Sequence, residues 1–193
     1  AAGFKWGVDQ AIGDLNAHFA SENTVFEAIE LDSGCSGDVA GPAAQTLVDS
    51  GVVAVVGAAC SGASMGANAI LSAAGIPMIS YASTNPGLSD EAVYPHFYRV
   101  VPSDAIQGPA GAAMMADAGV TNESLAILHM TNDYGSGLAD SIKTAWEADG
   151  SLCSAGMQGY EETTTNFDAM VANITDATDS NAVYLSSYIT DGA

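Results

Sequence analysis

Short apolar runs alternate with longer amphipathic patterns along the chain, and this alternation constrains the fold more than any other feature. Residues 52–56 are a continuous β-branched run, typical of a strand buried on both faces of a parallel sheet. The predicted strands are residues 24–31, 52–56, 76–81, 97–101, 125–130, 155–160 and 182–185. The predicted helices are residues 4–20, 38–48, 61–74, 104–118, 137–148 and 167–174. This order indicates an α/β fold with open parallel sheets and helices on both faces.

A tight break near residues 101–104 divides the chain into two lobes. Pro102 ends a predicted strand, and Ser103 or Asp104 can cap the helix that follows. We predict an N-terminal lobe over residues 1–101 and a second lobe over residues 102–193. The chain opens on a helix, whereas a doubly wound sheet normally begins with a strand. We therefore expect a fragment that is incomplete at both ends, with any signal peptide already removed.

The charge balance excludes several classes of partner. The 193 residues carry 3 Lys+Arg against 23 Asp+Glu, a formal net charge of -20. So few cations cannot form the basic footprint that nucleic acid or anionic lipid requires. The 48% of apolar residues is enough for a packed core. An acidic surface with so little lysine suggests a halophilic protein, because concentrated salt screens the self-repulsion.

No cofactor or metal is expected from the sequence. The three histidines are scattered and form no zinc pattern with cysteine, and no acidic loop has calcium-site spacing. The glycine-rich segment at residues 57–64 lacks the Lys and Ser/Thr of a phosphate loop. No apolar run approaches the roughly 20 residues that a membrane span needs.

Cys35 and Cys60 each follow a predicted strand, and neighbouring parallel strands would bring them within disulfide reach. Two buried free thiols are the alternative. Cys153 is either a buried thiol or paired outside these residues. A weaker hypothesis makes Cys60 a nucleophile at a helix N-terminus, which lowers a thiol pKa. The candidate bases for it are His18, His96 and His129.

The loops that follow four predicted strands share one chemistry. Ligands of open α/β sheets bind beyond the carboxyl ends of the strands. Residues 57–64, 81–86, 131–137 and 186–188 are rich in hydroxyls, glycine and tyrosine. Ser61 begins a helix, whose free N–H groups suit an anion such as a carboxylate. Ordinary turns remain the alternative for each loop, but together they indicate binding without reaction.

Five segments together resemble a known family. They are residues 52–61 (VVAVVGAACS), 75–86 (GIPMISYASTNP), 97–109 (FYRVVPSDAIQGP), 133–138 (DYGSGL) and 160–168 (YEETTTNFD). Their order and spacing resemble the type I periplasmic binding proteins, in particular the leucine/isoleucine/valine-binding family of ABC-transporter solute receptors. The resemblance implies two doubly wound lobes that close on a ligand like a Venus flytrap. It also implies a disulfide between Cys35 and Cys60.

The predicted ligand-binding residues are Ser61, Ala82, Ser83, Thr84, Tyr134 and Tyr188. All but Ser83 follow from the resemblance, and Ser83 belongs to the same hydroxyl-rich loop. In this prediction Ser61 and Thr84 hold a carboxylate and the Ala82 carbonyl accepts from an ammonium. The two tyrosines, from the second lobe, close over the ligand side chain.

The function that the resemblance implies is an exported solute receptor in the periplasm or outside the cell. It would deliver an amino acid, amide or small carboxylate to an ABC permease and act as a monomer, with no cofactor and no catalysis. The alternative is a sensory or regulatory ligand-binding domain on the same fold.

Overall fold

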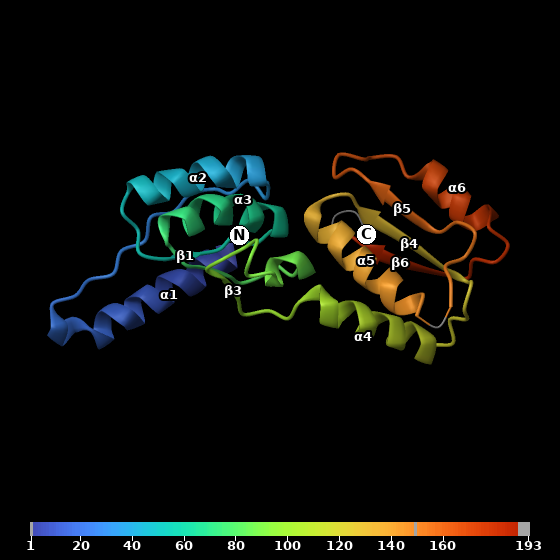
Figure 1. Cartoon of the computed structure of the whole chain (residues 1–193), viewed down its shortest axis with the longest axis horizontal. Coiled ribbons are helices and arrows are strands. Elements are labelled where there is room, and N and C mark those ends of the chain that lie inside the picture. Colours follow the sequence, from blue (N-terminus) through green and yellow to red (C-terminus); the bar gives the residue numbers. More distant parts are fainter. Residues whose placement is uncertain (1, 149, 189–193) are drawn as a thin grey trace.

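The computed structural model describes residues 2–148 and 150–188, and they form two separate sheets of three parallel strands. The N-terminal sheet has the order β1-β2-β3 and the second sheet the order β5-β4-β6. The strands are β1 (Val55–Val56), β2 (Met78–Ser80), β3 (Phe97–Arg99), β4 (Leu125–Met130), β5 (Met157–Tyr160) and β6 (Ala182–Ser186). The two halves lie side by side along the long axis, and the chain passes between them after β3 (Figure 1). The predicted parallel α/β architecture is confirmed.

The described residues form six helices, close to where the sequence predicts them. They are α1 (Ala2–His18), α2 (Gly37–Asp49), α3 (Ser61–Leu71), α4 (Asp104–Asp117), α5 (Asp133–Trp146) and α6 (Asp168–Asp176). Short 3-10 turns are η1 (Ala20–Glu22), η2 (Ser72–Ala74) and η3 (Pro86–Ser89). The side chains of Ser36, Ser103 and Asn132 cap α2, α4 and α5 by accepting backbone N–H bonds. The Asn132 cap explains why α5 begins four residues before the predicted start.

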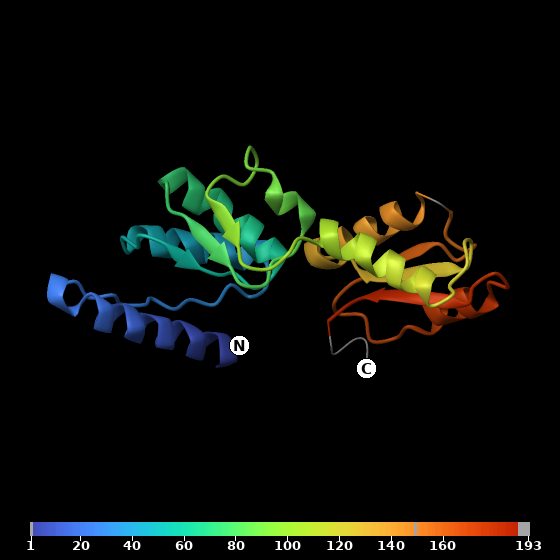
Figure 2. The same cartoon turned by 90° about the horizontal axis from the view of Figure 1, so that it is seen from below.

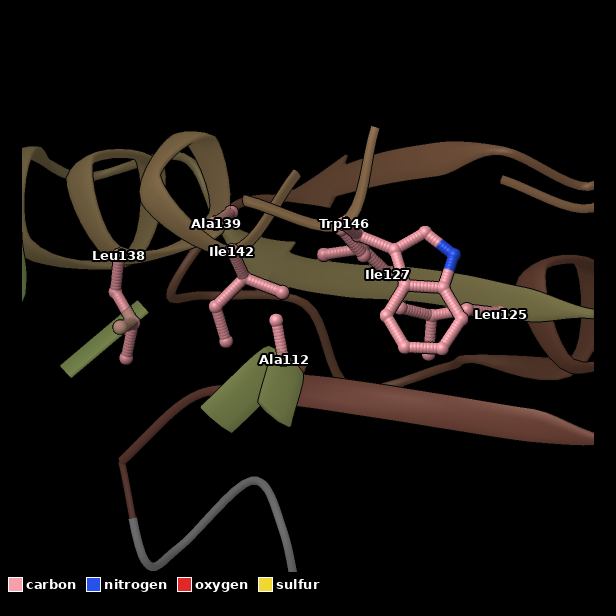
Figure 3. Packing of buried hydrophobic residues seen from close by; sticks show 7 residues of the cluster. All are labelled: Ala112, Leu125, Ile127, Leu138, Ala139, Ile142 and Trp146. Atoms are coloured by element: carbon pink, nitrogen blue, oxygen red, sulfur yellow. The ribbon is translucent and has the colours of Figure 1, made fainter. Parts of the chain in front are cut away.

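The second sheet is covered on both faces. Its central strand, β4, is buried at all six residues. Leu125 and Ile127 pack against Ala112 of α4 and against one side of α5 (Figure 3). Ala126 packs on the other face, against Ile174 of α6. Successive side chains of β4 point to opposite faces of the sheet, so both faces of this strand are buried.

The N-terminal sheet is covered on one face. Met78 packs there in a core supplied by the small side chains of α2 and α3. On the opposite face Val56, Ile79 and Tyr98 are exposed. The prediction that residues 52–56 are buried on both faces is therefore wrong, because α2 and α3 both contribute to the same side. Only Val55–Val56 pair as a strand.

Helix α1 and the segment after it run along one side of the N-terminal half (Figure 2). The predicted strand at 24–31 is wrong: within residues 2–148 and 150–188 no strand pairs with it. The amide of Asn16 instead bonds both backbone groups of Phe26, at 3.0 and 2.6 Å. The helical patterns around Trp6 and Trp146 predict that both side chains pack in the core. Trp146 is buried, but Trp6 is 67% exposed.

Within the described ranges, no helix combines the length and the hydropathy that a membrane crossing demands.

Candidate functional site

A cavity of about 340 Å³ lies between the two halves of the chain. Parallel strands bring their carboxyl ends to one edge of each sheet, and the loops that follow β1, β2 and β6 and the start of α5 meet there. The lining residues are Ala59, Cys60, Ser61, Ala82, Thr84, Gln107, Tyr134 and Tyr188. Five of the six residues predicted to bind ligand are among them. Such a volume is at the small end of ligand sites, which span about 300–1,000 Å³.

Ser61 begins α3 at one wall of the cavity. Its side chain is 1% exposed, and its Oγ accepts a hydrogen bond from the Asn85 backbone N–H at 3.2 Å. The residue before it, Cys60, makes no side-chain cap, so the first N–H groups of α3 receive no hydrogen-bond acceptor from the N-cap side chain. The hydroxyl hydrogen of Ser61 and these N–H groups are the donors that a carboxylate needs.

The loop after β2 places Ala82 and Thr84 in the lining and Ser83 behind it. Ser83 is fully buried. Its Oγ lies 2.8 Å from Ser64 Oγ and within 3.2 Å of the carbonyl oxygen of Ala58. Because these bonds use its hydroxyl, Ser83 holds the loop against α3 rather than facing the cavity.

Asp104 is a site residue that the sequence identifies only as a candidate cap. Ser103 caps α4, since its Oγ accepts from the Ala105 N–H at 3.2 Å. The Asp104 side chain is therefore free to turn inward, where it is 0% exposed. Its Oδ2 accepts a hydrogen bond from Thr84 Oγ1 at 2.8 Å, and its N–H donates to the Thr84 carbonyl at 2.9 Å. The Thr84 hydroxyl hydrogen is thus not available to a ligand carboxylate.

Burial dominates the electrostatics of this wall. It raises the pKa of the Asp104 carboxyl, and the Thr84 hydrogen bond and the charge of Arg99 oppose that rise. Burial also raises the pKa of Tyr134, with a further contribution from the negative charge of Asp104. The Asp104 carboxylate therefore adds to the rise in the pKa of Tyr134 that burial causes.

Tyr134 and Tyr188 form the wall contributed by the second half. Tyr134 lies in the first turn of α5, and Tyr188 follows β6. Their rings are stacked, with centroids 5.7 Å apart and planes 1° from parallel. The Tyr188 hydroxyl lies 3.5 Å from Cys35 Sγ, so it reaches across to the N-terminal half. The pair presents aromatic surface opposite the polar wall of Ser61 and Thr84.

Direct contacts join the two halves beside the cavity. The Asn85 side-chain amide donates to the Asp133 carbonyl at the start of α5. Gly137, one turn further along α5, leaves room for Asn85, because a Cβ there would collide with the amide. Gly62 likewise leaves room for the Asp133 carboxylate, with which a Cβ at this position would collide. Two glycines therefore allow this close approach.

Gln107 of α4 also lines the cavity, and it is not among the six residues predicted to bind ligand. A hydrogen bond with Gln107 opposes the raised pKa that burial gives Tyr184. Gln107 lies one turn after Asp104 on the same helix, and no sequence pattern marks either residue as part of the cavity.

Cys35 and Cys60 form a disulfide, with Cα atoms 5.2 Å apart. Cys60 lines the cavity with its sulfur in this bond. It therefore has no thiol to act as a nucleophile, which removes the alternative that joined Cys60 with a histidine base. Cys153 is buried with a free thiol.

Across the described part of the chain, no three His, Cys, Asp or Glu side chains gather as metal ligands would.

Comparisons with known proteins identify the family. The model of the family "Receptor family ligand binding region" matches residues 6–192. A leucine-specific-binding protein of Salmonella typhimurium is 30% identical over 168 residues, covering 87% of this chain and 45% of that protein. A Leu/Ile/Val-binding protein of Escherichia coli is 31% identical over 137 residues, covering 71% of this chain and 37% of that protein. The chain thus spans less than half the length of these relatives.

Solved structures agree with this result. An ABC-transporter substrate-binding protein of Desulfitobacterium hafniense, in complex with Leu, has a TM-score of 0.75 and 26% identity. The match covers 98% of this chain and 55% of that one. A periplasmic binding protein of Burkholderia mallei shares the fold at a TM-score of 0.81 and 16% identity, covering 95% of this chain and 48% of that one. This chain belongs to the family of receptor ligand-binding regions, in which its relatives include the leucine- and Leu/Ile/Val-binding proteins.

Proposed function

We propose that the protein is an extracytoplasmic solute receptor that captures a small amino-acid-like ligand between two lobes and delivers it to an ABC permease. The observation that carries this proposal is the cavity between the two sheets, lined from both halves of the chain. The relatives support it, because they are named for leucine, isoleucine and valine binding and a similar solved structure holds Leu.

Each wall of the cavity has a role in this proposal. Ser61 and the N-terminal N–H groups of α3 bind the ligand carboxylate. The Ala82 carbonyl accepts from the ammonium. Tyr134 and Tyr188 cover the aliphatic side chain. Ser83 contributes from behind, by fixing the loop that carries Ala82.

Closure couples binding to transport. In this proposal residues 1–101 and 102–193 form the two lobes. The described chain crosses from one sheet to the other after β3. A ligand that contacts both walls stabilises the closed form, because it makes contacts there that the open form lacks. The closed form is then the one that the permease recognises, and the protein acts as a monomer without a cofactor and without catalysis.

Isothermal titration calorimetry of the purified protein with leucine, isoleucine, valine, their amides and small carboxylates tests the proposal. We expect one class to bind, and Ser61→Ala to weaken it about tenfold or more, since a hydrogen bond to a charged group contributes about 1.5–3 kcal/mol. Ser21→Ala, an exposed hydroxyl in η1 outside the four loops, is the control. Failure of every candidate ligand to bind contradicts the proposal.

A sensory or regulatory domain on the same fold is the second candidate, because the matching family description names receptors. Reconstitution separates the two functions. Import by a permease that depends on the added receptor supports transport, whereas ligand binding without any dependent import supports sensing.

A further inference from the structure

Asn85 joins the two halves of the chain beside the cavity, although it is not among the residues that line the cavity. It lies at the end of the loop after β2, directly before η3. Its side-chain amide donates to the backbone carbonyl of Asp133, the first residue of α5. The hydrogen bond therefore ties the N-terminal half to the helix that carries Tyr134.

The other polar groups of Asn85 are bonded within the N-terminal half. Its side-chain oxygen accepts from the Gly87 N–H at 2.7 Å, and its backbone carbonyl accepts from the Arg99 guanidinium at 2.9 Å. Its backbone N–H donates to Ser61 Oγ at 3.2 Å. These bonds fix the position of Asn85 and leave its amide nitrogen to bond the second half.

The bond to Ser61 connects Asn85 with the proposed ligand. Ser61 Oγ accepts a hydrogen from Asn85, so the serine hydroxyl keeps its own hydrogen for a ligand carboxylate. We infer that Asn85 is a positioning residue that holds the two halves of the chain together and so raises ligand affinity without contacting the ligand. This inference rests on the proposed function and adds the residue that couples carboxylate binding to closure.

The second half is shaped to receive this amide. A Cβ at Gly137 of α5 would lie 2.5 Å from Asn85 Nδ2 and 3.2 Å from Pro86 Cδ. On the N-terminal half, Gly62 of α3 leaves room for the Asp133 carboxylate. The two halves therefore approach each other more closely here than side chains at positions 62 and 137 would permit.

The effect on ligand affinity follows from the population of the closed form. A ligand that needs both walls binds tightly only when the halves are together, so its apparent affinity scales with the fraction of closed molecules. One hydrogen bond between the halves raises the ratio of closed to open molecules about fivefold. Because this bond must break before the ligand leaves, we expect most of the effect in the dissociation rate.

A double-mutant cycle tests this inference, with the dissociation rate of leucine measured by stopped flow. Asn85→Asp keeps an oxygen that can accept from Gly87 but removes the donor to Asp133. Gly137→Ala takes the space of the amide from the opposite half, and alanine is favoured over glycine in a helix. Each variant is expected to raise the dissociation rate about fivefold, and the double variant no more than about tenfold, because both changes break one contact.

Asn166→Asp is the matched control. Asn166 is exposed, and its Oδ1 also accepts from the backbone N–H two residues later, at 2.8 Å. This variant is expected to leave the dissociation rate unchanged. Single variants that release leucine at the unmodified rate overturn the inference. A double variant whose effect is the product of the two single effects, about 25-fold, also overturns it.

Small-angle X-ray scattering without ligand gives a readout that does not depend on ligand binding. The radius of gyration is expected to be larger for Asn85→Asp and Gly137→Ala than for the unmodified protein and Asn166→Asp, because the halves move apart. Equal radii in all four proteins overturn the inference. If no candidate ligand binds the unmodified protein but the radii differ as expected, the proposed function fails and the role of Asn85 in holding the halves together is supported.

Discussion

Gly66 lies where α3 crosses α2, and its replacement by alanine tests how tightly the helices behind the cavity are packed. A Cβ at this position would lie 2.5 Å from both the Cα and the carbonyl oxygen of Gly37. Ordinary van der Waals contact begins near 3.4 Å, so the two backbones must separate by about 1 Å. Backbone atoms cannot rotate away as a long side chain would.

The magnitude follows from two opposing effects. Overpacking of a rigid contact costs about 3 kcal/mol, at the upper end of its usual range. Alanine gains about 1 kcal/mol over glycine in the interior of a helix. We therefore expect Gly66→Ala to lower the free energy of unfolding by about 2 kcal/mol, which lowers Tm by about 4–8 °C in a chain of this size.

Urea and thermal denaturation followed by far-ultraviolet circular dichroism measure this difference. Gly13→Ala is the control, because a Cβ on that α1 residue has no atom within 4 Å. It is expected to be neutral or to stabilise by up to about 1 kcal/mol. A Gly66→Ala protein as stable as the unmodified one would refute the reasoning, since it would mean that α2 and α3 can separate freely.

Three further predictions concern the disulfide, the buried carboxylate and the acidic surface. Replacing Cys35 and Cys60 by serine, which frees a loop of 25 residues, is expected to lower the free energy of unfolding by about 3.5 kcal/mol. Urea denaturation with and without dithiothreitol checks this, and the double variant should no longer respond to the reductant. Burial raises the pKa of the Asp104 carboxyl above its ordinary value of 3.8. Above pH 3.8 the folded state therefore keeps a proton that the unfolded state releases. The free energy of unfolding therefore falls as pH rises through this window, and Asp104→Asn removes that component from denaturation curves taken without ligand. Because the net charge is -20, we also expect Tm to rise between about 0.15 M and 1 M salt, as the Debye length falls from about 8 to 3 Å; a constant Tm would contradict a halophilic surface.

Local patterns predicted most elements because each has a period or a punctuation of its own. Residues 125–130 are apolar at every position except His129, and β4 occupies these six residues. Ser103 and the apolar repeat after it placed α4 to within one residue. The site loops could be located for the same reason, since ligands of parallel sheets meet the carboxyl ends of strands.

The errors arose where the partner of a segment decides its structure. Residues 24–31 have a strand-like composition, but a strand needs a neighbour, and Asn16 satisfies Phe26 instead. Trp6 lies on a helical pattern, yet the pattern does not say whether anything covers that helix. The burial of a side chain depends on both segments in contact, and the sequence of one segment does not show what packs against it.

The α/β class, the parallel sheets and the loops that meet at the cavity could be predicted from hydrophobic periodicity and from turn and cap residues. The chemistry of the cavity wall depends on contacts between distant segments. The tertiary structure gave the cap of α4 to Ser103 and turned Asp104 inward to take the hydrogen of Thr84. It also placed Ser83 behind the cavity lining and Gln107 in that lining. A hydroxyl donates or accepts according to the atom beside it, and here that atom lies 20 residues away in the chain.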